Sequence, residues 1–524
     1  MRLVNYSILI CQLAALWGGL TPQMVRAGER DDAALLDNYL HGKVPFKSIE
    51  SRVRACKRNS RGLFCPAWKR AKKFSRQMKS FRPIAKPFSA PEIADVFAIE
   101  KSGNLQNLKS LRKAEVKALL KWVEGLSQSE IKKYVQISLK EKRCPNRLSL
   151  ALGVALENYF PSTSAVQIAK LYEHGGRCFR STDRDRANFL TRAGIFFYYE
   201  NQFKDAVRVL SKVPSIDAYD GRHLYWLAKA YRKLDNGKSA QKVSDRLIRQ
   251  HPLSFHALLS SLESGKDLWG NLPEKTIKPM SRSRKSSNAN RWAALIEVLD
   301  RFGHSESASF LVNDTLKNYR RTEPEFKLYL LKLGDARLQI EAAPNLFLNY
   351  KSLRSKTLLQ FAYPERYWEL ISANSSSTDP YLLLAFANKE SRFDAKAVSI
   401  ADARGLLQLI PKTASQFGGN DSSNLFDPAT NIDIASRYLK HLMKLYNDRI
   451  PLVMAAYNAG EDAVTSWQKR YFHADPIIFL DLIPFRETRN YVGFVLMNYY
   501  WYKRLHNDHH VALSELIPQE LARK

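Results

Sequence analysis

The stretch YLLLAFANKESRF (residues 381–393) joins an apolar run to a carboxylate at its end. Leu, Ala and Phe fill the positions between Tyr381 and Asn388, which predicts a buried helix that ends close to Glu390. Burial makes ionisation of a carboxyl group costly, so the pKa of Glu390 is expected to rise until the side chain holds a proton near neutral pH. Such a group suits general acid catalysis. A lone Glu at a helix end is more often an exposed surface residue, so this stretch alone does not identify a site.

Three later motifs follow in the order SIADARGLLQLIPKTA (residues 399–414), AYNAG (456–460) and FRETRNYV (485–492). Together with the first stretch they closely resemble the soluble lytic transglycosylases, whose catalytic domain has a lysozyme-like fold. The close resemblance covers about residues 376 to 505. Upstream, FAYP (361–364) and a basic helical-repeat region are more weakly similar to the superhelical body of that family.

The resemblance implies a reaction for Glu390, the residue that matches the single catalytic Glu of the family. As an acid it would protonate the glycosidic oxygen between N-acetylmuramic acid and N-acetylglucosamine. As a base it would then take the proton of the muramic C6 hydroxyl, which closes on C1 to give a 1,6-anhydro sugar. Ordinary glycosidases need two carboxyl groups. A tethered hydroxyl removes that need, because it is already held beside the reacting carbon.

The matching positions also imply substrate-binding roles, each of which has a plainer structural alternative. Ser399 would lie near Glu390 or cap a helix, and Gly405 would let the backbone approach the substrate closely. Tyr457 would line the reacting centre or belong to the core. Glu487 would lie near the peptide-bearing sugar or form an ion pair with Arg489 or a neighbouring cation. The predicted substrate-binding residues are Ser399, Gln408, Tyr457, Asn458, Glu487 and Tyr491.

Asp402 departs from the pattern, since the family usually has Gly at this position. If its carboxylate points outward, only a loop changes, and this is the favoured interpretation. If it points toward the reacting centre, it could raise the pKa of Glu390 further or act as a second carboxylate and permit hydrolysis.

The middle of the chain predicts paired helices, because small residues recur at fixed spacings. Gly194 and Ala206 are twelve positions apart, and Ala228 and Ala240 repeat this spacing 34 positions later. Small residues at such positions let two antiparallel helices approach closely, and a period of 34 is that of tetratricopeptide-like repeats. Gly153 suggests an earlier, less regular copy. Chance register of amphipathic helices is the alternative, and both interpretations give an all-helical region.

The sequence therefore predicts an all-α protein in which a tetratricopeptide-like superhelix precedes a lysozyme-like, mainly helical catalytic domain. The predicted segments are a signal peptide (residues 1–27), the basic helical region (28–365), the catalytic domain (366–510) and a C-terminal tail (511–524). The signal peptide is predicted from a charged start, an apolar run and small residues at Val25-Arg26-Ala27. Export would place the protein in the periplasm without a transmembrane anchor.

Export also bears on the cysteines. Four remain after removal of the signal peptide, and an even number in an oxidising compartment predicts two disulfides. Pairing of neighbours, Cys56 with Cys65 and Cys144 with Cys178, is favoured, with four buried thiols as the alternative.

Charge is distributed unevenly along the chain. The net charge is +31, yet the segment from Ile371 to Lys524 has 17 Lys and Arg against 16 Asp and Glu. Such a basic N-terminal part favours an anionic polymer such as peptidoglycan as the partner. The competing hypotheses are a muramidase on the same fold, a non-catalytic basic wall-binding scaffold and a nucleic-acid-binding repeat; the last is disfavoured by the predicted export and by the lack of a base-reading motif. No metal-ligand spacing or phosphate-binding loop is present, so no cofactor is expected.

Overall fold

A computed structural model of the chain describes residues 27–58, 63–80, 116–144, 147–180, 182–215, 220–265, 272–275, 277, 287–318, 324–375, 378–419, 422–471, 473, 475–506 and 511–518. Within these ranges the structure is almost entirely helical, and β pairing is limited to two isolated bridges, Val398 with Arg404 and Arg404 with Leu409. The predicted all-α class is confirmed. The predicted signal peptide lies outside the described residues apart from Ala27. Among the described helices, none is long and apolar enough to cross a membrane.

The chain forms two compact units, one made of residues 1–83 and 277–338 and the other of residues 84–276 and 339–524. In the first unit Phe74 packs edge-on against Trp292 and Phe310, with ring centroids 5.9 and 5.5 Å apart. The predicted disulfide between Cys56 and Cys65 is present and joins two neighbouring helices. The helices of this unit are α2 (Ala27–Leu40), α3 (Phe46–Arg58), α4 (Cys65–Ser80), α16 (Ser287–Arg301), α17 (Ser305–Asn318) and α18 (Pro324–Lys332).

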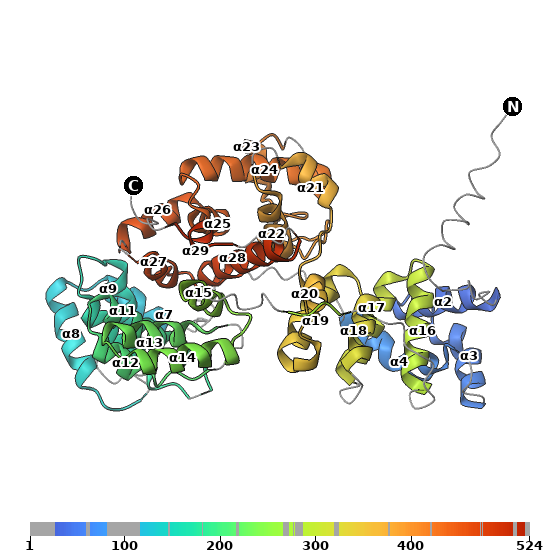
Figure 1. Cartoon of the computed structure of the whole chain (residues 1–524), viewed down its shortest axis with the longest axis horizontal. Coiled ribbons are helices and arrows are strands. Elements are labelled where there is room, and N and C mark those ends of the chain that lie inside the picture. Colours follow the sequence, from blue (N-terminus) through green and yellow to red (C-terminus); the bar gives the residue numbers. More distant parts are fainter. Residues whose placement is uncertain are drawn as a thin grey trace. The chain divides into compact units, whose positions relative to one another are not determined.

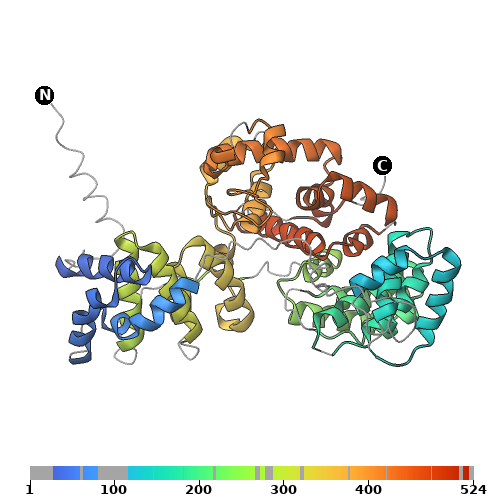
Figure 2. The ribbon, with the colours of Figure 1, turned by 180° about the vertical axis from the view of Figure 1, so that it is seen from behind.

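The second unit begins with a series of antiparallel helix pairs (Figures 1 and 2). Gly194 is needed for one pair, since a Cβ there would meet the Leu210 side chain at 2.4 Å. Gly153 is needed in the same way against Tyr172, at 2.9 Å. Gly194 and Gly153 thus lie where paired helices approach closely, as predicted, whereas the 34-residue repeat stays a prediction. The helices of this region are α7 (Val116–Glu124), α8 (Gln128–Lys140), α9 (Arg147–Asn158), α10 (Ala165–Gly176), α11 (Arg184–Tyr199), α12 (Phe203–Leu210), α13 (Arg222–Lys233), α14 (Gly237–Gln250) and α15 (Phe255–Glu263).

The second predicted disulfide, Cys144 to Cys178, is also present and ties the segment after α8 to the end of α10. The helices that follow are α19 (Ala336–Asn349), which spans the boundary between the units, η2 (Lys351–Leu353), α20 (Lys356–Ala362) and α21 (Trp368–Asn374).

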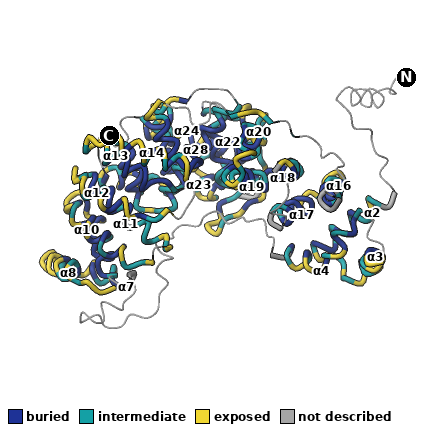
Figure 3. Tube along the Cα trace, turned by 60° about the horizontal axis from the view of Figure 1, so that its bottom comes forward, coloured by how far each residue is buried: buried dark blue, intermediate teal, exposed yellow. Residues whose placement is uncertain are grey.

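The remaining helices surround two buried ones, α22 and α28, whose burial is visible in Figure 3. The Ser-rich stretch between Asn374 and Pro380 separates two helices, since α21 ends at Asn374 and α22 begins at Pro380. The helices are α22 (Pro380–Glu390), α23 (Pro411–Gln416), η3 (Ser422–Phe426), α24 (Pro428–Leu445), α25 (Ile450–Ala459), α26 (Glu461–Arg470), α27 (Pro476–Leu482), α28 (Arg486–His506) and α29 (Leu513–Leu516).

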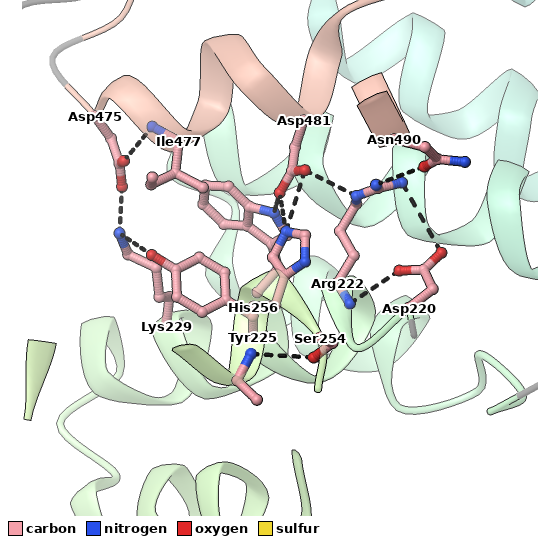
Figure 4. Close-up of polar contacts among 12 residues, drawn as sticks. Asp220, Arg222, Tyr225, Lys229, Ser254, His256, Asp475, Ile477, Asp481 and Asn490 are labelled. Carbon is pink, nitrogen blue, oxygen red and sulfur yellow. Dashed lines mark hydrogen bonds and ion pairs between the residues drawn. The ribbon is translucent and has the colours of Figure 1, made fainter. Parts of the chain in front are cut away.

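Helix α27 is fastened to α13 and α15 by the buried carboxylate of Asp481 (Figure 4). Arg222 Nε and Trp226 Nε1 donate to its two oxygens at 2.8 and 2.7 Å, and His256 Nε2 donates at 2.9 Å. Burial by itself raises the pKa of Asp481, but the charges of His256 and Arg222 and their hydrogen bonds outweigh this and hold it at about 2. Asp481 is therefore ionised and fully satisfied in the interior.

A second buried carboxylate, Glu157 of α9, fastens the segment between α26 and α27. It accepts hydrogen bonds from the hydroxyls of Tyr172 and Tyr471, both at 2.5 Å, and pairs with Arg192. Arg192 also donates to the Leu482 carbonyl at 2.8 Å. Two separate acid clusters thus connect the helical pairs to the C-terminal helices within this unit.

Candidate active site

Glu390 is the last residue of α22. The helix begins with Asp379 as its cap, whose side chain accepts from the Tyr381 N–H at 2.8 Å, and with Pro380 in its first turn. After Glu390 the chain leaves the helix sharply, because Arg392 and Phe393 both have positive φ, 53° and 64°. Non-glycine residues rarely adopt this conformation, which is concentrated at functional sites.

The carboxyl group of Glu390 receives a hydrogen bond from Tyr491 Oη at 2.5 Å. Burial raises the pKa of Glu390 to about 7; the Tyr491 bond and the charge of Lys389 act against this, and the charge of Glu487 adds to it. Burial also lowers the pKa of Lys389 to about 8. A carboxyl group with a pKa near neutrality can donate a proton and later accept one at the same pH. The expected elevation of this pKa agrees with the structure.

Aromatic rings surround this carboxyl group. Phe386 packs against Tyr457 with ring centroids 4.8 Å apart, and Tyr438 lies 5.3 Å from Tyr457 on another side. The Tyr457 hydroxyl donates to the Leu407 carbonyl at 2.7 Å. Burial, followed by the charge of Glu390, raises the pKa of Tyr457 far above its usual value. Tyr457 is therefore a neutral ring and hydroxyl close enough to Glu390 to sense its charge.

For the peptidoglycan cleavage that the family resemblance implies, we expect Tyr491→Phe to lower kcat/KM about tenfold or more, since a hydrogen bond to a charged group contributes about 1.5–3 kcal/mol. The same change removes the bond that lowers the pKa of Glu390. The alkaline limb of the pH–activity profile, expected near pH 7 in the parent protein, should therefore move to higher pH.

The matched control is Tyr499→Phe, which removes another tyrosine-to-carboxylate bond of the same helix, to Asp379 at 2.7 Å. It should leave the alkaline limb in place. If Tyr491→Phe lowers activity without moving that limb, Tyr491 acts on something other than the proton of Glu390.

Ser399 and Gln408 lie in the bridged loop between α22 and α23. The Ser399 hydroxyl oxygen accepts from the N–H groups of Ala401 and Ala403 at 3.1 and 2.9 Å, so it orders the loop rather than a helix end. The Gln408 amide donates to the Ala397 and Gly405 carbonyls at 3.1 and 2.9 Å, and its buried Oε1 has no partner among the described residues. In this structure both side chains hold the loop together, and their contact with substrate remains a prediction.

Gly405 lets the backbone pack closely against other parts of the same chain. Its predicted close approach to a substrate stays a prediction. Gly405 has φ +77°, and a Cβ there would meet the Leu425 carbonyl at 2.0 Å and the Asn431 amide at 2.5 Å. The backbone thus packs against its own chain at this point. Asn431 of α24 is fully buried, donates to the Arg404 and Leu425 carbonyls and accepts from the Leu407 N–H.

Sequence reasoning missed Asn431, although a signal was available. It lies in register with Ala435, Tyr438 and Leu442, so it is a polar residue on the apolar stripe of its helix. A polar residue in that position usually has a buried hydrogen-bonding role.

The departure at Asp402 also has a structural explanation. Asp402 has φ +62°, a conformation that Gly adopts freely and Asp tolerates better than most residues. Its side chain is 56% exposed and forms a two-point contact with the Arg404 guanidinium at 2.9 and 3.0 Å. The carboxylate is thus engaged by a neighbouring residue of its own loop.

The AYNAG motif lies at the end of α25, and the FRETRNYV motif lies at the start of α28. Asn458 Oδ1 accepts from the Thr488 hydroxyl at 2.7 Å and so joins these two helices. One carboxylate oxygen of Glu487 is buried, and its charge acts on Glu390. Glu487 does not pair with Arg489, which has no carboxylate within ion-pair distance among the described residues.

The structure thus brings Tyr491, Tyr457 and Glu487 close to Glu390, places Asn458 beside this group and leaves Ser399 and Gln408 bonded within their loop. Among the described residues, no group of three or more His, Cys, Asp or Glu could hold a metal ion. The pair His509-His510 lies outside the described residues.

Comparison with known families gives this arrangement an evolutionary context. Residues 369–479 match the family model described as the transglycosylase SLT domain. The C-terminal part of the chain contains an SLT domain. The matched segment of the SLT domain includes Glu390 and Tyr457 but ends before Glu487 and Tyr491.

Curated relatives of the SLT domain are named lytic murein transglycosylases. The soluble lytic murein transglycosylase of Escherichia coli is 31% identical over 166 residues, which are 30% of this chain and 26% of that protein. The membrane-bound lytic murein transglycosylase C of Mannheimia succiniciproducens is 27% identical over 45% of this chain and 63% of that protein. In both cases the chain covers less than two thirds of the relative's own length.

A similarity of fold extends over nearly the whole chain. The solved complex of the 70-kDa soluble lytic transglycosylase with bulgecin A has a TM-score of 0.51 to this chain, at 15% identity, and the match covers 98% of this chain and 94% of that one. At this identity the match shows the fold alone. It supports the predicted order of a helical region followed by the SLT domain.

Proposed function

We propose that this protein is a lytic transglycosylase that cleaves the β-1,4 bond between N-acetylmuramic acid and N-acetylglucosamine in peptidoglycan. The observation that carries the proposal is Glu390, a half-buried carboxyl group with a pKa of about 7 that Tyr491 holds by a hydrogen bond. The SLT match and the names of the relatives support the substrate class.

In the proposed reaction, protonated Glu390 gives its proton to the glycosidic oxygen and the bond to C1 breaks. The resulting carboxylate then accepts the proton of the muramic C6 hydroxyl as that oxygen bonds to C1. Glu390 ends in its starting state, and no water is consumed. The Tyr491 hydrogen bond stabilises the carboxylate between the two steps, because a charged acceptor strengthens such a bond.

Hydrolysis on the same fold is the main alternative, and the charge of Glu487 near Glu390 is the observation that favours it. A second carboxylate could activate water in place of the sugar hydroxyl. Two observations count against this route: one oxygen of Glu487 is buried, and Asp402 is paired with Arg404.

Mass spectrometry of digested peptidoglycan distinguishes the two reactions. We expect muropeptides with 1,6-anhydro ends, each lighter by one water molecule than its reducing-end counterpart. We expect Asp402→Gly to give the same products, since its carboxylate takes no part in the proposed reaction. Reducing ends from the parent protein would replace the proposal by a muramidase, and a switch of product in Asp402→Gly would make Asp402 part of the chemistry.

We also propose that the protein acts in the periplasm, where residues 1–27 would direct it, and that its basic N-terminal part holds the anionic wall. Exposed cations on α3 and α4, among them Lys57, Lys69, Lys73 and Arg76, provide the attraction. Binding of the protein to isolated cell walls should weaken as the salt concentration rises. Retention without any lysis would support the wall-binding scaffold, and salt-resistant retention of sheared DNA would support the nucleic-acid repeat.

A further inference from the structure

A cavity of about 90 Å³ lies between helices α11, α13 and α15 and one face of α28. A cavity of this volume holds several waters or one small polyatomic ion. Four arginines line it, Arg184, Arg222, Arg486 and Arg489, against two carboxylates, Asp220 and Asp481. The lining is therefore cationic by composition.

Both carboxylates are already engaged by Arg222. Asp481 accepts from Arg222, Trp226 and His256, which uses both of its oxygens (Figure 4). Asp220 accepts from the Arg222 backbone N–H at 3.1 Å and lies 4.0 Å from its guanidinium. These acids therefore compensate Arg222 first.

Arg489 is the cation left uncompensated. Its guanidinium donates to the Ile483 carbonyl, a neutral acceptor, and its buried Nε has no partner among the described residues. Burial and then the charges of Arg222 and Arg192 lower the pKa of Arg489, and the charges of Asp481 and Asp220 offset this only in part. A buried charge without a counter-charge is strongly unfavourable, so this position is suited to an anion supplied from outside the chain.

We propose that this cavity binds a small oxyanion, either a carboxylate or a phosphate group. Guanidinium groups present N–H donors in pairs, which match the paired oxygens of both. The site is separate from the candidate active site, because the cavity is lined by Arg489, Asn490 and Gly493 of α28, whereas Tyr491 points from another face of that helix to Glu390. The inference does not depend on the proposed catalytic activity.

Thermal unfolding of the full-length mature chain in chloride buffer at constant ionic strength tests this site. The probes are inorganic phosphate and N-acetyl-D-alanyl-D-alanine, a neutral peptide apart from its terminal carboxylate. We expect a saturable rise in Tm with at least one of them, because a ligand that binds only the folded state stabilises it. Response to phosphate alone, to the peptide alone or to both would identify the source of the oxyanion.

Arg489→Gln should weaken the apparent affinity at least about tenfold, as expected for loss of a charged hydrogen bond. Without added oxyanion it should fold with unchanged or higher Tm, since it removes an uncompensated charge. Arg437→Gln, on the exposed face of α24, is the matched control and should titrate like the parent protein.

Should Arg489→Gln not fold, Arg184→Gln at the exposed rim of the cavity provides the same comparison. A Tm that does not saturate with either probe, or an unchanged titration in the arginine variants, would overturn the proposal.

Discussion

Glu390→Gln is expected to abolish peptidoglycan lysis, with a loss of about 10³-fold or more, because a positioned acid and base contributes about 10²–10⁴-fold and here one group supplies both steps. Binding of the variant to isolated cell walls should be the same as that of the parent protein. The measurement is release of soluble muropeptides from purified peptidoglycan. Glu124→Gln, at an exposed position of α7, is the control and should remain fully active.

The same variant should be more stable at alkaline pH. The pKa of Glu390 rises from 4.5 to about 7 on folding. Its ionisation therefore destabilises the folded state as the pH rises through this range, and the full effect is present above about pH 7. Gln cannot ionise, and we expect a gain in unfolding free energy of about 3 kcal/mol at pH 8 and little change near pH 4.5. Loss of lysis together with loss of stability would indicate a structural defect, and retained lysis would remove Glu390 from the mechanism.

Asp481→Asn is expected to have the largest effect on stability, a loss of about 3–5 kcal/mol in unfolding free energy. It removes the charge that compensates buried Arg222 and that accepts the hydrogen bond of His256. The control is Asp433→Asn, which breaks an exposed pair with Arg437 on α24 and should cost less than about 1 kcal/mol. Denaturant unfolding of both variants at pH 7 provides the comparison.

The pH dependence of this contribution has a definite sign. The pKa of Asp481 falls from 3.8 to about 2 on folding, so its stabilisation is present above about pH 4 and lost as the pH falls toward 2. The difference between Asp481→Asn and the parent protein should therefore shrink in acid. A constant difference across this range would mean that packing rather than charge holds Asp481.

Local patterns predicted local structure well. The small residues Gly194 and Gly153 lie where paired helices meet, and the break before Pro380 separates two helices. Helix starts were less clear, since α16 begins at Ser287, whereas the apolar periodicity of that helix starts only at Trp292. Polar residues such as Ser and Asn are compatible with the first turn of a helix, where apolar periodicity has no influence.

The candidate site was predictable where a motif carries chemistry and unpredictable where distant residues supply it. Glu390 could be named from its own stretch and its resemblance, but the hydrogen bond from Tyr491 joins residues 101 positions apart. Asp481 gave no signal, because its partners Arg222, Trp226 and His256 lie more than 220 positions earlier. Such contacts depend on tertiary packing, which local patterns of apolar residues in the sequence do not predict.

The buried attachment of α27 has a practical consequence for dividing this protein. A fragment starting near residue 366 would contain Glu390 and every predicted substrate-binding residue, and by sequence it would look complete. It would nevertheless expose Asp481 and Tyr471 without their partners Arg222, Trp226 and Glu157. The segment that contains the proposed site is therefore shorter than the segment that shares its buried contacts, and the earlier helices form part of the interior of the C-terminal helices.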